Sequence, residues 1–344
     1  MFALSLDGGT TLPAVHGWMG VGEAMECSLA EYSGNALEAV RDFAGTRPLY
    51  ASRFGRWVAT DWRYFPGEEC DLLPPGARIN VETGRTKTDS LQGRPSKGSV
   101  VEAAKELASL IDSAVEARLN GVKKAAVSFS GGLDSSILAA CAMKHTETIG
   151  CTVHASRSRD SQAAPSAAKS LGLELLQVDV SERAARESAA AASLPFKPDL
   201  MDRSLWCVYS LASQMAAGAG AGVIMLGQLA DELFGGYSKY QLALEERGPG
   251  HADELMREDI AGCASRGFIR DEAACSKWLE PRFPFADPRV IRAGFSMPVS
   301  FKVDGTRRKA VLREAASMLG VPKELVNAPK KAAQYSSGIQ KLLG

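Results

Sequence analysis

The chain has 344 residues, enough for two domains that each bury a core of their own. Its 40 basic and 40 acidic residues cancel, without a dense basic run, which argues against nucleic acid and against an anionic membrane surface as partners. The seven cysteines are scattered and form no C-x-x-C pair, so neither a disulfide framework nor a zinc site is expected. The N-terminus lacks the basic-then-apolar pattern of a signal peptide, and we expect a cytoplasmic protein.

Residues 1–84 are predicted to form a small β-rich domain with one short helix. The helix candidate is Glu31 to Phe43, and the strand candidates are Leu49 to Ser52, Trp57 to Thr60 and Ala77 to Val81. Residues 85–98 are polar and rich in helix and strand breakers, which predicts a linker.

Residues 99–344 are predicted to form the second domain. Ser99 and Glu102 have the spacing of a capping box, and one apolar face continues from there to Leu119. Strands and helices then alternate, with predicted strands at 123–129, 148–154, 174–180 and 223–226. This order predicts an α/β fold with a parallel sheet covered by helices, followed by a helical C-terminal part. Ligands of such sheets bind beyond the carboxyl ends of the strands.

A loop rich in glycine and serine, Ser130-Gly131-Gly132-Leu133-Asp134-Ser135-Ser136, joins the first of these strands to a helix. Such a loop directs backbone N–H groups and the positive end of a helix dipole at one point. Glycines allow close backbone approach, and hydroxyls add donors, so the loop suits a phosphate chain. The carboxylate of Asp134 then indicates a bridging Mg²⁺. The plainer alternative is a turn of small residues.

A second acidic loop, Gly227 to Tyr237, follows the strand at 223–226. Asp231 could reach the same ion as Asp134, because two carboxylates beside a phosphate are costly unless a cation offsets them. The alternative is an acidic helix N-terminus, in which Asp231 and Glu232 favour the dipole.

Two later stretches are less informative by themselves. Arg270 to Asp287 has the composition of a charged turn entering a helix, with Glu280 and Arg282 free to pair. Pro329 to Tyr335 contains two lysines, which near a C-terminus usually belong to a solvated face.

Together the four stretches resemble the synthetase domain of class B asparagine synthetases, one of the ATP-pyrophosphatases with an adenine-nucleotide alpha-hydrolase-like fold. Ser130 to Ser136 is similar to the family's S-G-G-x-D-S loop, and Gly227 to Tyr237 to its G-x-G-x-D-E-x-x-G-G-Y. Asp271 to Asp287 is similar to its D…E-x-R-x-P-F-x-D, and Arg308 to Glu314 to its K-x-x-L-R-E helix. Lys330 falls where the family carries a late catalytic lysine.

The resemblance implies ATP and Mg²⁺ as cofactors, with the adenine near Thr152 and Val153. A carboxylate, aspartate by expectation, would attack the α-phosphorus, and ammonia or another amine would then displace AMP. Lys330 would balance charge that develops at the phosphorus. The implied nucleotide-binding residues are Phe129, Ser130, Gly131, Gly132, Leu133, Asp134, Ser135, Ser136, Val153, Leu226 and Gly227. The implied metal ligands are Asp134 and Asp231, and the implied catalytic residues are Lys330, Glu232 and Gln228.

Two departures from the family concern the amine. Arg41 to Tyr50 is similar to a stretch of the family's glutaminase domain, but Phe2 stands where that domain needs its nucleophilic cysteine. We therefore interpret residues 1–84 as a shortened relic and expect no glutamine hydrolysis. Gln228 replaces an acid that would assist the incoming ammonia, a role worth roughly 10²- to 10⁴-fold in rate, and Leu229 replaces a glycine.

The sequence is also compatible with three other functions. One is amide formation on another acid, as in the β-lactam synthetases and peptide-cyclising relatives. Another is a tRNA-thiolating pyrophosphatase, which shares the first loop but would need catalytic cysteines or a basic RNA-binding face. The third is a non-catalytic ATP-binding partner. A homodimer is also compatible with the sequence.

Overall fold

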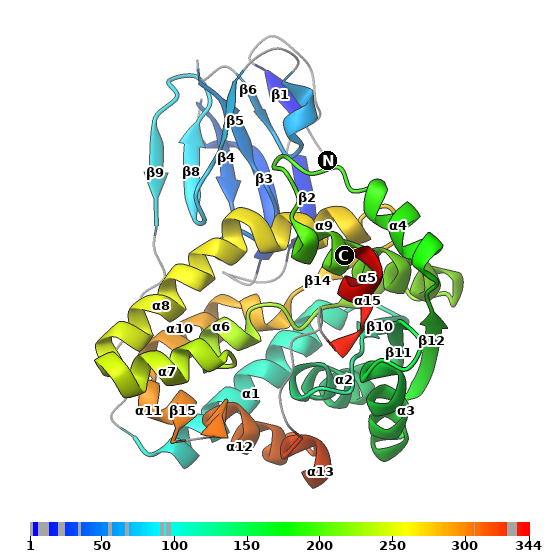
Figure 1. Ribbon diagram of the computed structural model, residues 1–344. Coiled ribbons are helices and arrows are strands. Elements are labelled where there is room, and N and C mark those ends of the chain that lie inside the picture. Colours follow the sequence, from blue (N-terminus) through cyan, green and yellow to red (C-terminus); the bar gives the residue numbers. More distant parts are fainter. Residues whose placement is uncertain are drawn as a thin grey trace.

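The computed structural model describes residues 3–5, 14–19, 25–33, 36–53, 57–65, 69–89, 93, 98–305, 307–328 and 336–344. In Figure 1 the two antiparallel sheets of the N-terminal part lie at the top, above helices α8 and α9. The parallel sheet lies below α8 and α9.

The N-terminal domain consists of two antiparallel sheets. One has the order β1-β6-β5-β7, and the other has the order β2-β3-β4-β8-β9. Apolar side chains such as Leu49, Val58 and Ile79 form its core. The bounds are β1 (Ala3–Ser5), β2 (Ala14–Met19), β3 (Met25–Ser33), β4 (Ala36–Arg41), β5 (Tyr50–Ser52), β6 (Trp57–Ala59), η1 (Trp62–Tyr64), β7 (Cys70–Leu72), β8 (Ala77–Asn80) and β9 (Thr86–Thr88). Since β9 pairs with β8, this sheet extends into residues predicted as linker.

The predicted helix from Glu31 to Phe43 is wrong, because β3 and β4 form a hairpin there. Leu37 and Ala39 are buried, whereas Glu38 between them is only half-buried. This period of two belongs to a strand with one buried face. Pairing with β3 and β8 overrides the helix-forming composition of the segment.

The second domain is built on a five-stranded sheet in the order β12-β11-β10-β13-β14, with every neighbouring pair parallel. The strands are β10 (Lys124–Ser128), β11 (Glu147–His154), β12 (Glu174–Asp179), β13 (Val223–Met225) and β14 (Glu280–Arg282). The helices between them are α1 (Val100–Leu119), α2 (Leu133–His145), α3 (Asp160–Leu171), α4 (Glu182–Ala190) and α5 (Leu200–Gly218). The predicted fold class is confirmed. Strand order reverses at β10 and β13, where such sheets open a crevice for ligands.

The start of α1 is as predicted, because Ser99 Oγ accepts from the Glu102 N–H and the Glu102 carboxylate accepts from the Ser99 N–H. The hydrogen bonds that the Glu102 carboxylate accepts from the Ser99 N–H and the Ser99 hydroxyl lower the pKa of Glu102. The stretch Glu280 to Arg282, predicted as a charged turn, is instead the edge strand β14. Pro281 is compatible with an edge position, where one backbone donor is not needed.

The C-terminal part is helical, as predicted, apart from β14 and the hairpin of β15 (Val303–Asp304) with β16 (Arg307–Arg308). Its elements are α6 (Ala230–Phe234), α7 (Ser238–Arg247), α8 (Pro249–Gly262), the π-helix η2 (Cys263–Gly267), α9 (Phe268–Cys275), η3 (Pro284–Ala286), α10 (Pro288–Ser296), α11 (Val299–Lys302), α12 (Ala310–Met318), α13 (Lys323–Val326) and α15 (Ile339–Leu343). In the described part of the chain, none of the helices has the length and apolarity needed to cross a bilayer.

Lys302, at the end of α11, gives a pH-dependent contribution to stability. Its side chain is 2% exposed, and burial lowers its pKa to about 8 against the opposing field of Asp253. Between this pKa and the ordinary 10.5, the unfolded chain binds more protons than the folded one. The free energy of unfolding should therefore rise by about 3 kcal/mol from about pH 8 to 10.5, and Lys302→Met should lose this rise in urea unfolding. An equal rise in the variant would contradict the assignment.

Candidate active site

The loops that follow β10 and β13 meet at the reversal of strand order. A Cβ placed on Gly227 would lie 3.2 Å from the Asp134 Cβ, so the two loops are in contact there. Leu229, which precedes α6, has a φ of 78°, a left-handed conformation that glycine adopts freely and leucine rarely does. The second loop thus keeps a glycine-like backbone at a position occupied by leucine.

The first loop turns tightly against α3. Gly131 has a φ of 71°, and a Cβ on it would lie 2.9 Å from the Ala163 carbonyl oxygen. Gly132 precedes α2 and provides no side-chain cap for it. Ser135 Oγ donates to the Gly132 carbonyl at 3.1 Å, which closes the turn from within. The start of α2 is therefore available to an anion, as expected of a phosphate-binding loop.

Asp134 and Asp231 converge on one buried ammonium group. Lys309 Nζ lies 2.5 Å from Asp134 Oδ1 and 2.7 Å from Asp231 Oδ1. The Lys309 side chain is fully buried, and both carboxylates are largely buried. A Cβ on Gly236 would lie 1.8 Å from Asp231 Oδ1, so only glycine fits beside this cluster. Lys309 thus offsets the charge of one of the two adjacent carboxylates.

A cavity of about 740 Å³ opens in front of both loops. Predicted site residues that line it are Phe129, Ser130, Gly132, Asp134, Ser135, Val153, Gly227, Gln228, Asp231 and Glu232. Gly131 and Leu133 line a small adjoining cavity together with Arg159, Lys309 and Arg313. Ser136 and Leu226 are fully buried and line neither cavity. Lys330 and Phe2 lie outside the described residues.

Glu232 forms a carboxyl–phenol pair on the wall of the cavity. Tyr237 Oη donates to Glu232 Oε1 at 2.6 Å, and Glu232 is 6% exposed. Burial, together with the charge of Asp231, raises the pKa of Glu232, while the Tyr237 hydrogen bond and Lys309 oppose the rise. A carboxyl with a raised pKa inside a cavity is typical of an acid–base group.

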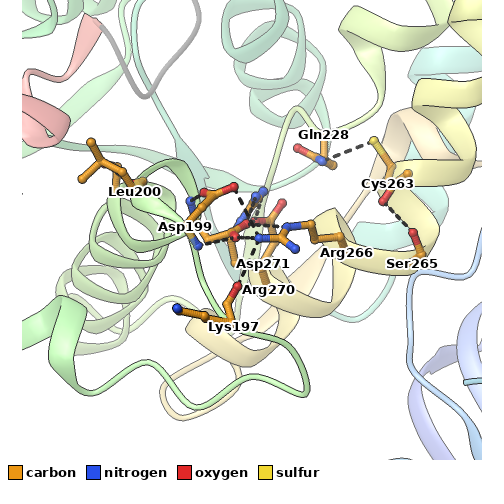
Figure 2. A network of polar contacts seen from close by, with 12 residues as sticks. Lys197, Asp199, Leu200, Gln228, Cys263, Ser265, Arg266, Arg270 and Asp271 are labelled. Atoms are coloured by element: carbon orange, nitrogen blue, oxygen red, sulfur yellow. Dashed lines mark hydrogen bonds and ion pairs between the residues drawn. The ribbon is translucent and has the colours of Figure 1, made fainter. Parts of the chain in front are cut away.

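Residues of the π-helix η2 and of the neighbouring start of α9 also line the cavity, and Figure 2 shows Gln228 facing Cys263 of η2. Gln228 Nε2 lies 3.6 Å from Cys263 Sγ, and a Cβ on Gly267 would approach the same Nε2 to 2.7 Å. The Arg266 guanidinium stacks on the Phe196 ring, 4.3 Å from its centroid, and pairs with Asp202. A π-helix at this place is informative, because π-bulges occur frequently at functional sites.

The family model for asparagine synthase matches residues 106–268 and 252–343 of the chain. The chain belongs to the asparagine synthase family. A protein of Methanocaldococcus jannaschii named as a glutamine-hydrolysing asparagine synthetase is 30% identical over 92% of this chain and 69% of its own length. The human glutamine-hydrolysing asparagine synthetase is 27% identical over 80% of this chain, and the match spans only 53% of the human protein.

Two further similarities are more limited. Asparagine synthetase domain-containing protein 1 of Mus musculus is 35% identical over 36% of this chain and 21% of that protein. Among solved structures, NMN synthetase from Francisella tularensis aligns with a TM-score of 0.38 and 13% identity, over 72% of this chain and 87% of that chain. The predicted family is confirmed by the family model and by the archaeal relative, and it makes the chain a member of a family of ATP-dependent amide ligases.

One motif of the asparagine synthase family has a structural role here. Arg282 donates to the Arg118 carbonyl, and Asp287 pairs with the Arg118 guanidinium at 2.9 Å, with Arg118 and Asp287 both fully buried. Asp271 pairs with Arg270 at 2.7 Å, and burial raises the pKa of Asp271 to about 6. None of Asp271, Arg282 and Asp287 lines the cavity. Their contacts instead join β14 and the residue after η3 to α1, and stabilise α9.

The site contains residues that the sequence did not assign to it. Lys309 and Tyr237 lie within family motifs and could have been found by asking which motif residues are charged or polar. Cys263 and Arg266 belong to no motif, and only the fold brings them to the cavity.

Proposed function

We propose that the protein is an ATP-dependent amide-forming ligase that activates a carboxylate, aspartate first among candidates, and transfers ammonia or another amine to it. The observation that carries the proposal is the convergence of Asp134 and Asp231 on one cation, beside a glycine loop at a helix start. Such a site is suited to a metal-bound triphosphate. Family membership supports the same chemistry.

The donor set fits the expected metal. Mg²⁺ is usually held by one or two carboxylates and completes its shell with substrate phosphates and water. No group of three or more metal-ligating His, Cys, Asp or Glu side chains occurs among the described residues, so Asp134 and Asp231 alone would hold the ion. The metal would neutralise phosphate charge. Lys309 keeps the two carboxylates close together, and its ammonium would remain beside the phosphates.

The proposed reaction has two steps. A carboxylate oxygen of the acid attacks the α-phosphorus, and the bond from that phosphorus to pyrophosphate breaks, giving an acyl-adenylate. The amine nitrogen then attacks the acyl carbon, the bond to AMP breaks, and the nitrogen loses a proton. Lys330 would stabilise charge at the phosphorus in the first step. The backbone at Ser130 to Ser136 would hold the phosphates, and Thr152 and Val153 would lie near the adenine.

The amine side of the cavity favours ammonia or an uncharged amine over glutamine as donor. Gln228 can donate and accept hydrogen bonds but cannot remove a proton from ammonium. Glu232 is the nearby carboxyl on the cavity wall, and we assign to it the uptake of the proton that the nitrogen loses. Phe2 offers no nucleophile for glutamine hydrolysis.

The test is product analysis by mass spectrometry after incubation with ATP, Mg²⁺, aspartate and either ammonium chloride or glutamine. We expect AMP, pyrophosphate and asparagine with ammonium, with a rate that increases toward alkaline pH as free NH₃ increases. Glutamine should give no asparagine. Formation of ADP would contradict the ligase chemistry, and equal rates with glutamine would contradict the assigned amine source.

One observation favours a larger acid as the second candidate. Met201, Leu205, Val208 and Tyr209 of α5 add an apolar wall to the cavity. An acid with an apolar body would use that wall, whereas aspartate would not, and amide formation on another acid is the reaction type of the β-lactam synthetases and peptide-cyclising relatives. Pyrophosphate release measured across a panel of acids separates the two candidates, because aspartate alone should trigger it in the first case.

A further inference from the structure

The π-helix η2 separates the cavity from the N-terminal domain. On one side, Cys263, Arg266 and Gly267 line the cavity. On the other side, Ala264 is 3% exposed, and its carbonyl accepts a hydrogen bond of 2.6 Å from Arg41 Nη2. One element of five residues therefore lines the proposed substrate cavity and contacts the N-terminal domain, whose described residues are absent from the lining of that cavity.

The Arg41 guanidinium is held on all sides by carbonyl groups. It donates to the carbonyls of Arg47 at 2.9 Å, Leu73 at 2.5 Å and Gly45 at 2.7 Å, besides that of Ala264. Its side chain is 1% exposed. Burial lowers the pKa of Arg41 to about 10, so the group stays charged at neutral pH. Hydrogen bonds from a charged donor in a dry setting are shorter and stronger than neutral ones.

The turn that follows Arg41 is rigid and presses directly on η2. Asp42 accepts hydrogen bonds from the backbone N–H groups of Ala44, Thr46 and Arg47. Gly45 has a φ of 69°, and a Cβ on it would lie 3.1 Å from both the Ala264 Cβ and the Arg41 Cζ. The contact therefore has no spare room, and a displacement of the turn would be transmitted to η2.

We infer that Arg41 is a positioning residue, through which the N-terminal domain keeps η2 in its π-helical form. The hydrogen bonds of a π-helix span five residues instead of the four of an α-helix, and such segments are rare, so a contact that holds one of its carbonyls from outside favours this form. Loss of the Ala264 contact would let the segment rotate toward α-helical geometry. Cys263 would then leave its contact with Gln228, and Arg266 and Gly267 would be displaced along the wall.

Hydrogen exchange measured by mass spectrometry tests this inference on the full chain, without any substrate. Arg41→Lys keeps the charge but cannot reach four carbonyls. It should raise amide exchange in residues 263–271 by about tenfold or more, and leave residues 124–140 of β10 and α2 nearly unchanged. The matched control is Arg78→Lys, which alters an exposed ion pair with Glu38 in the same domain and should change neither region.

Gly45→Ala provides a second route to the same contact. Its added methyl group would push on Ala264 and Arg41 and should therefore raise amide exchange in residues 263–271. If Arg41→Lys does not fold, this variant alone tests whether the contact supports η2. Unchanged exchange in residues 263–271, or a rise spread equally over both regions, would overturn the inference, since a purely structural role affects the whole chain.

A kinetic measurement adds to the exchange data and rests on the proposed function. With aspartate and ammonium, Arg41→Lys should raise the KM for ammonium by about tenfold, because η2 contacts Gln228 on the amine side of the cavity, and leave the KM for ATP within about twofold of the wild type. Equal changes in both KM values would contradict the inference. If the wild type turns over no acid, the proposed function fails, and hydrogen exchange alone still decides the role of Arg41.

Discussion

Lys309→Met should lower the free energy of unfolding by about 3–5 kcal/mol in the absence of Mg²⁺, because it leaves the largely buried carboxylates of Asp134 and Asp231 facing one another without a cation. On the proposed metal role, Mg²⁺ would bind the folded form at these carboxylates, and saturating MgCl₂ should then restore part of the loss, about 2.7 kcal/mol at a hundredfold excess over its Kd. Urea unfolding with and without MgCl₂ measures both effects.

Lys302→Met is the matched control, because it makes the same substitution at another buried lysine. Lys302 bridges no pair of carboxylates in the described part of the chain, and its charge is opposed by burial. This variant should unfold at neutral pH with an unchanged or higher free energy, and MgCl₂ should not alter the difference from wild type. Equal losses in the two variants, or a loss in Lys309→Met that MgCl₂ leaves untouched, would contradict the role of Lys309.

Lys330→Ala should reduce turnover by about 10²- to 10³-fold, since the lysine is proposed to stabilise charge that develops only in the transition state. Nucleotide binding should stay within a few fold of the wild type. Pyrophosphate release gives the rate, and calorimetric titration with ATP and Mg²⁺ gives the affinity.

Lys331→Ala is the neighbouring control and should keep full turnover. If the two variants behave alike, the assignment of the late lysine is wrong. If the wild-type chain binds ATP and releases no pyrophosphate with any acid, the chain is a binding partner rather than a ligase.

The sequence predicted best what depends on local pattern. The capping box of Ser99 and Glu102 is read from four residues, and the alternation of strands and helices follows from periodicity. The meeting of Asp134 and Asp231 was also predictable, because each follows a strand of one parallel sheet and carboxyl ends of parallel strands share an edge.

The rest depends on contacts that no local pattern encodes. Lys309 is 175 residues from Asp134 along the chain and reaches it from a left-handed backbone position with a φ of 58°. Arg266 and Cys263 line the cavity from η2, a π-helix between two α-helices that no pattern in the sequence predicted. The prediction of a helix from Glu31 to Phe43 was wrong because it relied on local pattern alone. In the fold, strand pairing between β3 and β4 outweighs the local helix propensity of this segment.

The central claim is that this cavity joins a carboxylate to the α-phosphorus of ATP, and an oxygen label tests it most directly. The wild-type protein is incubated with ATP, Mg²⁺, ammonium and aspartate labelled with ¹⁸O in its carboxylates, and the released nucleotide is analysed by mass spectrometry. We predict AMP that carries one ¹⁸O atom from the acid. Unlabelled AMP, or ADP with the label in inorganic phosphate, would contradict attack at the α-phosphorus.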